Sequence, residues 1–360
     1  MGYYINRPLG FPPTFEPIAI EEAAIMTAAK PQVHVIGTGG SIAGIGPDRM
    51  DYMLYSEIGD HLTIEQSLAR VPEIGGFASV TSEDLVSVGS TAIGAPEWLA
   101  LAARINSLLA EGSSLTGVAV THGTATLEET AYFLHLTVKS DKPVVVTGAM
   151  RPPTAISTDA DLNLMDAVRI AASPHAGGMG VLTVLNNEIH SARDVSKANT
   201  FRVETFRPNE LGFLGYADSD HQVVFYRAPL RKHTTATSFD TAGRDTLPRV
   251  EIVYSYAGAD GSVVDAVRRL RPDGLVVVGF GGGTFPPAFL AAAARAVEDG
   301  IPVVLASRST AGRVVNTPRK TEQGFIVCDN LLPQKARVLL MLALTVSEDR
   351  KWLQQAFLEY

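Results

Sequence analysis

The 360-residue sequence has almost no cysteine, because Cys328 is the only one. One thiol cannot form an internal disulfide framework or supply a cysteine-rich zinc site, so the sequence excludes both classes of protein. A reducing compartment is compatible with this composition. We predict no metal centre and no organic cofactor.

Long hydrophobic runs and clusters of basic residues are also absent. No apolar stretch approaches the ~20 residues needed to span a bilayer, so we predict no membrane contact. Residues 1–30 have no basic start followed by an apolar core, because Pro and Glu interrupt them. We interpret them as a Pro-rich N-terminal arm of a cytoplasmic protein. The formal net charge of -8 argues against a nucleic-acid partner, since phosphate binding depends on clustered Lys and Arg.

What the sequence does contain is a regular alternation of β-branched runs and amphipathic stretches. Runs such as "VHVIG" and "PVVVTG" are typical of buried strands, and "APEWLALAARINSLLA" carries apolar residues at helical spacing. This alternation predicts an α/β fold with a mostly parallel sheet covered by helices on both faces. We assign a larger N-terminal domain to residues 31–225, a polar linker to 226–248 and a smaller C-terminal α/β domain to 249–360.

The first candidate site residue is Ser41, which follows a predicted strand in "VIGTGGSIAGIG". Ligands bind at the carboxyl ends of parallel strands, and the glycines before Ser41 would let a ligand approach the backbone. A dinucleotide-binding fingerprint and a nucleophile elbow are both incomplete here, because each lacks its last glycine. A simple turn with an exposed serine is the remaining interpretation.

The segment "VTHGTATLEE" repeats this arrangement after a second strand. Thr124 lies there near the start of the next helix, whose free N–H groups favour an anion. Thr126 and Glu129 have the spacing of a capping box, which predicts a structural role for both. His122 is more typical of a structural strand-end histidine than of a catalytic base.

A third segment, "SARDVSKANT", follows the predicted strand "GVLTVL". Lys197 lies among small polar residues, where burial would lower its pKa and let it help to deprotonate a hydroxyl group or a water molecule. A lone lysine is usually solvated. Its neighbours Arg193 and Asp194, at the same strand end, make Lys197 a candidate.

Together these segments resemble the bacterial-type L-asparaginase/glutaminase amidohydrolases. The matching blocks occur in family order over nearly the whole chain: "TGGSIAG", "THGTATLEETAYFL", "KPVVVTGAMRPPTAISTDADLNL", "RDVSKANT" and "LLPQKARVLLMLAL". The resemblance implies a large and a small α/β domain and hydrolysis of a small-molecule amide without a cofactor. It also implies a homotetramer whose active sites lie between the subunits of an intimate dimer.

By position, the resemblance assigns catalytic roles to four residues. Ser41 matches the family's nucleophilic threonine, and Tyr55 is our choice for the tyrosine that helps to activate it, with Tyr52 as the alternative. Thr124 matches the second catalytic threonine, and Lys197 matches the lysine that partners it. We therefore expect an acyl-enzyme on Ser41, with Tyr55 and Lys197 as proton carriers.

The resemblance also outlines the substrate pocket. Ser90 matches the serine that binds the substrate's α-carboxylate, and Gly40 and Gly123 precede the two catalytic hydroxyl residues. Thr91 stands where the family usually has a glutamine, and Ala125 stands where it has the aspartate that completes a Thr-Lys-Asp triad. In the family, both of these missing side chains contact the substrate's α-ammonium group.

Further contacts to that ammonium group are missing too. Thr284 stands where several members have an asparagine that reaches the neighbouring subunit, and Arg319 and Lys320 lie where some members supply a glutamate. Several explanations stay open: a substrate without an α-ammonium group, a genuine L-asparaginase of weak activity, an engineered Asp-to-Ala variant, or a non-catalytic binding protein. We expect the first, because a buried ammonium group without a counter-charge is destabilised by several kcal/mol.

Overall fold

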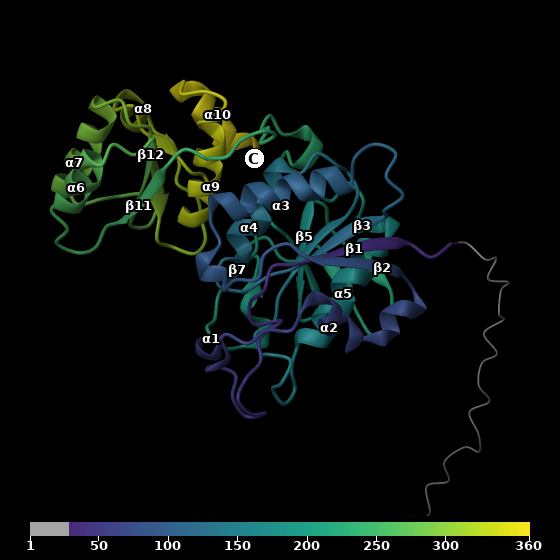
Figure 1. Cartoon of the computed structure of the whole chain (residues 1–360). Helices are drawn as coiled ribbons and strands as arrows, with labels where there is room; N and C mark the ends of the chain where they lie inside the picture. The colour runs from purple at the N-terminus through teal and green to yellow at the C-terminus, as the bar shows by residue number, and fades with distance from the viewer. Residues whose placement is uncertain (1–28) are drawn as a thin grey trace, which may run out of the picture. The chain divides into compact units, whose positions relative to one another are not determined.

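The computed structural model describes residues 29–360, so most of the predicted N-terminal arm, residues 1–28, lies outside the described residues. Residues 31–360 form one compact unit that contains two sheets with helices packed against them (Figure 1). The larger sheet is mostly parallel and the smaller one is entirely parallel. This architecture confirms the predicted α/β class.

Within the described residues, the larger sheet has eight strands in the order β10-β9-β6-β5-β4-β3-β1-β2. Strands β2, β1, β3, β4 and β5 run parallel, whereas β6, β9 and β10 extend the sheet through antiparallel pairs. The carboxyl ends of β1, β3 and β4 therefore lie side by side. The strands are β1 (Gln32–Gly37), β2 (Ser79–Asp84), β3 (Gly117–Thr121), β4 (Val144–Thr147), β5 (Val181–Leu185), β6 (Glu188–Ser191), β9 (Gly215–Ala217) and β10 (Val223–Phe225).

Helices cover both faces of this sheet because its central strands are apolar on both sides. Every residue of β3 is buried: Val118 and Val120 belong to a cluster with α3 and α4, and Ala119 belongs to a second cluster with α5. The helices of this domain are α1 (Tyr55–Ile58), α2 (Ile64–Ala69), α3 (Ala95–Leu108), α4 (Leu127–Thr137) and α5 (Ala160–Ala172), with 3-10 helices η1 (Pro72–Gly76), η2 (Ser90–Ala92), η3 (Pro174–Ala176) and η4 (Val203–Thr205).

The smaller sheet has the strand order β11-β12-β13-β14 and is parallel throughout. Parallel strands need crossover connections, which helices supply here. The elements are β11 (Val250–Tyr254), α6 (Ser262–Arg269), β12 (Gly274–Gly279), α7 (Pro287–Glu298), β13 (Val303–Ser307), α8 (Pro318–Glu322), β14 (Ile326–Val327), α9 (Pro333–Ala343) and α10 (Arg350–Glu359).

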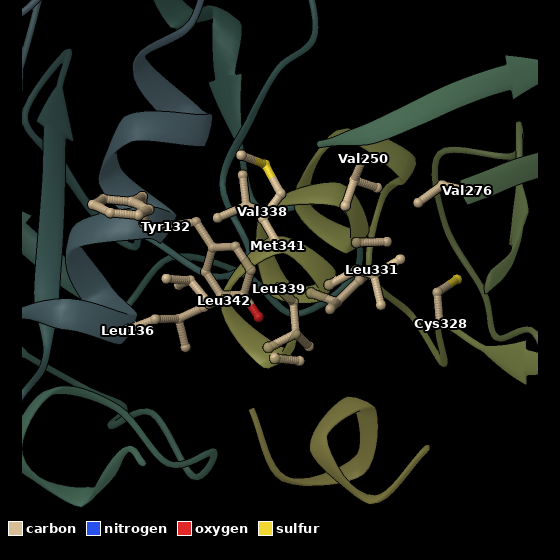
Figure 2. Close-up of a cluster of buried hydrophobic side chains, with 14 of the residues drawn as sticks. Tyr132, Leu136, Val250, Val276, Cys328, Leu331, Val338, Leu339, Met341 and Leu342 are labelled. Carbon is tan, nitrogen blue, oxygen red and sulfur yellow. The ribbon is translucent and has the colours of Figure 1, made fainter. Parts of the chain in front are cut away.

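One of the hydrophobic clusters runs through both domains. Helix α4 of the larger domain packs against α9 of the smaller one, where Tyr132 and Leu136 lie beside Val338, Met341 and Leu342 (Figure 2). Helix α4 begins shortly after the Thr124 segment. The core thus connects the smaller domain to the helix that follows a candidate site residue.

Residues 226–248 connect the two sheets with the 3-10 helix η5 (Thr234–Ala236) as their single regular element. Lys232 Nζ pairs with the Glu359 carboxylate at 2.7 Å. The buried ring of Phe239 packs on the Tyr360 ring, with 4.7 Å between their centroids. This polar segment is therefore held against α10 and the residue that follows it.

The antiparallel extension of the larger sheet was not predicted. Asn186 and Asn187 both have positive φ angles, 54° and 63°, and connect β5 to β6 as a tight hairpin. Asparagine tolerates this conformation better than most residues, so the "NN" pair was a usable signal. Consequently the segment that contains Lys197 follows the strand β6 and not, as expected, the end of "GVLTVL". It continues into a separate two-stranded sheet of β7 (Ser196–Lys197) and β8 (Phe206–Arg207).

Candidate functional site

The loops that follow β1 and β3 meet through their glycines. A methyl group placed on Gly40 would lie 2.2 Å from the Cα atom of Gly123, so the two backbones are in contact. Gly40 also has a φ of 86°, which side chains of L-residues rarely adopt. Thr38 adds a hydrogen bond from its Oγ1 to the Thr121 carbonyl oxygen at 2.8 Å. Glycine is therefore required at position 40 by both contact and conformation.

Ser41 lies at this junction, and 5% of its surface is exposed. Its Oγ donates a hydrogen bond to the Ala149 carbonyl oxygen at 2.5 Å, which ties the β1 loop to the loop after β4. A methyl group on Gly148, the preceding residue, would lie 3.0 Å from Cγ2 of Thr124. The side chains of Ser41 and Thr124 therefore approach the same short segment of the β4 loop from two different strands.

Thr124 and Lys197 form a direct polar pair. Lys197 Nζ lies 2.7 Å from Thr124 Oγ1. Burial lowers the pKa of Lys197, and the negative charge of Glu128 opposes that shift. A lowered pKa increases the fraction of neutral amine, which can accept a proton from a hydroxyl group or water. The structure thus brings together two residues that lie far apart in the sequence.

Glu128 is a site residue that the sequence analysis missed. It lies in the first turn of α4 with 7% of its surface exposed, and its Oε1 is 3.5 Å from the backbone nitrogen of Lys197. Its Oε2 accepts a hydrogen bond from the Gln334 amide at 3.2 Å. The signal in the sequence was a charged residue within a helix that is otherwise apolar on nearly all sides, because buried carboxylates require donors.

Ser90 lies beside Gly123, and it is buried. A methyl group on Gly123 would lie 2.7 Å from Cβ and Oγ of Ser90, so these two predicted pocket residues are in contact. Gly123 therefore has the β1 loop on one side and the Ser90 turn on another.

The predicted capping box at Thr126 and Glu129 is wrong. The Thr126 hydroxyl donates to the Ser90 carbonyl oxygen at 2.7 Å, and it makes no capping bond to α4. Glu129 faces Arg337 of α9, with 3.9 Å between Oε2 and the guanidinium nitrogen. Thr126 has φ −122° and ψ 11°, outside the extended conformation that a capping residue usually adopts, so its side chain is not placed to accept from the first turn of α4. Thr126 thus braces the Ser90 turn against the loop that contains Thr124.

Of the two candidate tyrosines, Tyr55 packs against the turn that contains Ser41. A methyl group on Gly44 would lie 2.7 Å from the Tyr55 ring, and the Gly44 N–H donates to the Ser41 carbonyl oxygen. Tyr52 is 44% exposed and meets the edge of the Phe201 ring at 6.4 Å between centroids. The structure thus brings the Tyr55 ring to the turn that contains Ser41, and the role of Tyr55 stays a prediction.

The positions that depart from the family pattern lie at the surface. Thr91 and Ala125 are both exposed, although Ala125 lies between the buried Thr124 and the half-buried Thr126. Thr284 is exposed and donates to the Phe280 carbonyl oxygen at 3.1 Å. The α-ammonium contacts expected from the resemblance are therefore replaced by a methyl group and two hydroxyl groups.

Two cations lie in α8, in the segment where the resemblance implies a carboxylate in some members of the family. Arg319 and Lys320 lie in α8, and Lys320 Nζ donates to the carbonyl oxygens of Val315 at 2.9 Å and Gly282 at 3.3 Å. Burial lowers the pKa of Lys320. Lys320 thus ties α8 to the glycine loop that precedes Thr284.

His122 has the environment of a structural residue. It is fully buried, and its Nδ1 lies 2.8 Å from the Gly123 carbonyl oxygen. Burial lowers the pKa of His122 to about 4, so the ring is neutral at pH 7. The buried ring packs beneath the Gly123 loop, as the sequence analysis favoured.

The site combines buried hydroxyl groups with a lysine amine whose pKa is lowered by burial. Across residues 29–360, no three His, Cys, Asp or Glu side chains gather in a way that could hold a metal ion. In the same residues, no helix is both long enough and apolar enough to cross a bilayer. The chemical groups gathered near the strand ends include the hydroxyls of Ser41, Ser90 and Thr124, the Lys197 amine, the Glu128 carboxylate and the Tyr55 ring.

The sequence and the fold match known proteins over most of the chain. A family model described as "Asparaginase, N-terminal" matches residues 32–231, and one described as "Glutaminase/Asparaginase C-terminal domain" matches 249–357. "L-asparaginase 2" of Bacillus subtilis is 43% identical over 92% of this chain and 87% of its own length. "Probable L-asparaginase periplasmic" of Haemophilus influenzae is 40% identical over 92% and 93%. The crystal structure of a probable cytoplasmic L-asparaginase from Campylobacter jejuni has a TM-score of 0.87 and 39% identity, and the match covers 92% of this chain and 100% of that one.

Proposed function

Since the chain belongs to the asparaginase family of amidohydrolases, we propose that it hydrolyses a carboxamide whose α-carbon bears no ammonium group. The products are a carboxylate and ammonia. The observation that carries the proposal is Ala125, which directly follows the Thr124–Lys197 pair and presents a methyl group where the family has a carboxylate.

The proposed reaction proceeds through an acyl-enzyme. Ser41 Oγ attacks the amide carbon, its proton passes by way of Tyr55 to the leaving nitrogen, and the C–N bond breaks to release ammonia. Water then attacks the ester, assisted by the Thr124–Lys197 pair, and Ser41 Oγ leaves with a proton. The close contact of Ser41 with Ala149 O supports this assignment because it holds the hydroxyl in a fixed direction.

Electrostatics support the assignment of specificity. An α-ammonium group held in the pocket needs a carboxylate partner, because an unpaired charge that loses water is destabilised. A carboxylate that contacts the pair, that of Glu128, is buried with its oxygens directed at the Lys197 backbone and Gln334. Thr91 and Ala125 provide no charge. A hydrogen or carbon substituent suits this side of the pocket better than an ammonium group does.

We expect succinamate to be hydrolysed with a higher kcat/KM than L-asparagine. The two amides differ by the α-ammonium group alone, so the comparison isolates the contact that Ala125 cannot make. The measurement is ammonia release from succinamate, L-asparagine, L-glutamine and simple aliphatic amides, at equal enzyme concentration.

Two results of this assay would overturn parts of the proposal. A preference for L-asparagine would contradict the specificity and favour a genuine L-asparaginase, which is what the relatives are named. Absence of ammonia from every amide, with tight binding of one of them, would favour a non-catalytic binding protein.

We further propose that the protein is a homotetramer, or at least a dimer, with each pocket completed by a second copy. The family resemblance supports this assembly, in which residues near Thr284 and α8 reach the neighbouring site. Light scattering at assay concentration is expected to give the mass of an oligomer of the 38.3 kDa chain. A monomer with full activity would contradict it.

We also propose a cytoplasmic location. The likeness to the Campylobacter jejuni protein, which is named cytoplasmic, supports it. The Haemophilus influenzae relative is named periplasmic, so the family includes both locations. Cell fractionation with an antibody to the native protein distinguishes them.

A further inference from the structure

We propose that Lys335 and Gln334, in the first turn of α9, are positioning residues that set the distance between Thr124 and Lys197. Both belong to the smaller domain, whereas the pair that they position belongs to the larger one. The inference rests on the proposed role of that pair, and it identifies what holds the pair together.

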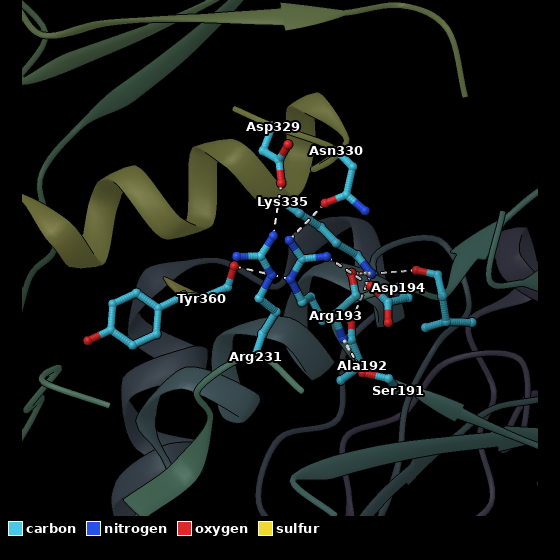
Figure 3. Close-up of polar contacts among 10 residues, drawn as sticks. Ser191, Ala192, Arg193, Asp194, Arg231, Asp329, Asn330, Lys335 and Tyr360 are labelled. Carbon is cyan, nitrogen blue, oxygen red and sulfur yellow. Dashed lines mark hydrogen bonds and ion pairs between the residues drawn. The ribbon is translucent and has the colours of Figure 1, made fainter. Parts of the chain in front are cut away.

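Lys335 is a buried cation that binds main-chain oxygens. Its side chain is 1% exposed, and its Nζ donates to the carbonyl oxygens of Ala192 at 2.7 Å, Arg193 at 2.9 Å and Val195 at 2.5 Å. An ammonium group has three donors, so these bonds use all of them. Figure 3 shows Lys335 reaching from α9 to the turn that contains Ala192 and Arg193. The Lys335 ammonium group therefore binds three carbonyl oxygens of one turn of the larger domain.

This turn leads directly to Lys197. Val195, the last residue that Lys335 binds, is followed by β7, a strand of two residues that pairs with the equally short β8. On the C-terminal side of Lys197, the backbone N–H groups of Ala198 and Asn199 donate to Thr205 at 2.8 and 2.7 Å. The Lys335 contacts supply the anchor on the N-terminal side.

Gln334 holds the other half of the pair. Its amide nitrogen donates to Glu128 at 3.2 Å, and Glu128 lies four residues after Thr124. The other oxygen of Glu128 faces the backbone nitrogen of Lys197. Adjacent residues of α9 thus bind the turn before Lys197 and the helix after Thr124, so a shift of α9 would change their separation.

The Arg193 side chain also connects the same turn to the smaller domain. Arg193 donates from Nη1 to Asp194 at 2.9 Å, from Nη2 to Asn330 at 2.9 Å and from Nε to the main-chain oxygen of Tyr360 at 3.1 Å (Figure 3). These partners span the loop before α9 and the residue after α10. The turn is consequently fixed to the smaller domain from two sides, and Lys335 is the fully buried contact of the set.

The test compares Lys335→Met with Lys142→Met. Lys142 is a matched control because its Nζ also binds carbonyl oxygens, those of Ser113 at 2.7 Å and Leu115 at 2.8 Å, at the start of β4 and away from the strand ends of the site. Both variants remove one charge and one set of lysine–carbonyl bonds. We expect both to lower Tm, and Lys335→Met alone to lower kcat by about 10²-fold with little change in KM, as misplaced catalytic groups do.

A direct readout of Lys197 separates positioning from stability. The pKa of Lys197 is measured by pH-dependent acetylation with acetic anhydride, followed by mass spectrometry of the Lys197 peptide. Burial is the main cause that lowers this pKa. Loosening the turn in Lys335→Met admits water and is expected to raise the pKa, whereas Lys142→Met leaves it unchanged. The rising limb of kcat against pH moves to higher pH in the same variant.

If Lys335→Met does not fold, Gln334→Leu tests whether α9 positions the Thr124–Lys197 pair. Gln334 is half-buried, so its loss is milder, and we expect a change in kcat and in the Lys197 pKa of the same direction but smaller size. Folded variants with the kcat and Lys197 pKa of the unsubstituted protein would overturn the inference. The labelling does not need turnover, so a protein that hydrolyses no amide would refute the proposed function and leave this test valid.

Discussion

Ser41→Ala and Thr124→Val are each expected to lower kcat/KM by at least about 10³-fold, the size seen when a hydroxyl that takes part in the chemical step is removed. Ser41→Ala removes the oxygen that forms the acyl-enzyme. Thr124→Val keeps the volume of the side chain but leaves Lys197 Nζ without the partner that lies 2.7 Å away. Ammonia release under steady-state conditions, with the preferred amide from the substrate panel, measures both.

Two further variants serve as controls for this result. Ser41→Thr keeps the hydroxyl and introduces the threonine that the family has at this position, so it should retain most of the activity. Thr147→Val removes a buried hydroxyl that donates to the Val184 carbonyl oxygen at 2.7 Å, one strand away, and is expected to affect Tm more than turnover. Near-normal kcat/KM in both Ser41→Ala and Thr124→Val would refute the mechanism.

Ala125→Asp is expected to shift specificity towards L-asparagine. The new carboxylate gains a charge-assisted hydrogen bond with the α-ammonium of asparagine, and it has no such partner in succinamate. Since bonds to charged groups contribute about 1.5–3 kcal/mol, the ratio of kcat/KM for asparagine over succinamate should rise by about 10-fold or more. The measurement is kcat/KM for both amides in both proteins.

Ala125→Asn controls for size, because it adds a side chain of similar shape without the charge. It should leave the ratio close to that of the unsubstituted protein. Adding Thr91→Gln to Ala125→Asp restores the second ammonium contact of the family and should increase the shift further. If the ratio responds equally to Asn and Asp, charge is not what selects the substrate, and Ala125 requires another explanation.

The central parallel sheet could be predicted because its residues are buried on both faces. The run Gly117–Thr121 is apolar in every position that packs, and such a run has few alternatives to a central strand. The edge strands could not be predicted in the same way. β2 has the sequence "SVTSED" and is only half-buried, so its assignment depends on pairing with β1 and not on its own pattern.

Site residues could be predicted where a reactive side chain comes directly after a predicted strand. Ser41 and Thr124 are of this kind. Glu128 and Lys335 were not predictable by such reasoning, because their role arises from contacts with residues that are distant in the sequence. Thr126 shows the converse: local spacing predicted a helix cap, but its backbone is not extended as a cap requires, and its hydroxyl donates to the Ser90 carbonyl oxygen, 36 residues earlier. Short-range spacing does not reveal such a backbone conformation or such a distant contact.

The contact between Lys335 and the Ala192 carbonyl oxygen joins residues 143 positions apart, which affects the order in which the molecule assembles. Pairings of such long sequence separation form late, because the loop between the two residues must first be closed. While the chain is being synthesised, the larger sheet can form before α9 exists, but the turn before Lys197 then lacks its anchor. In a nascent chain whose first domain has folded, Lys197 would therefore not yet be held in its final position. The site would be complete only after the second domain has packed against the first.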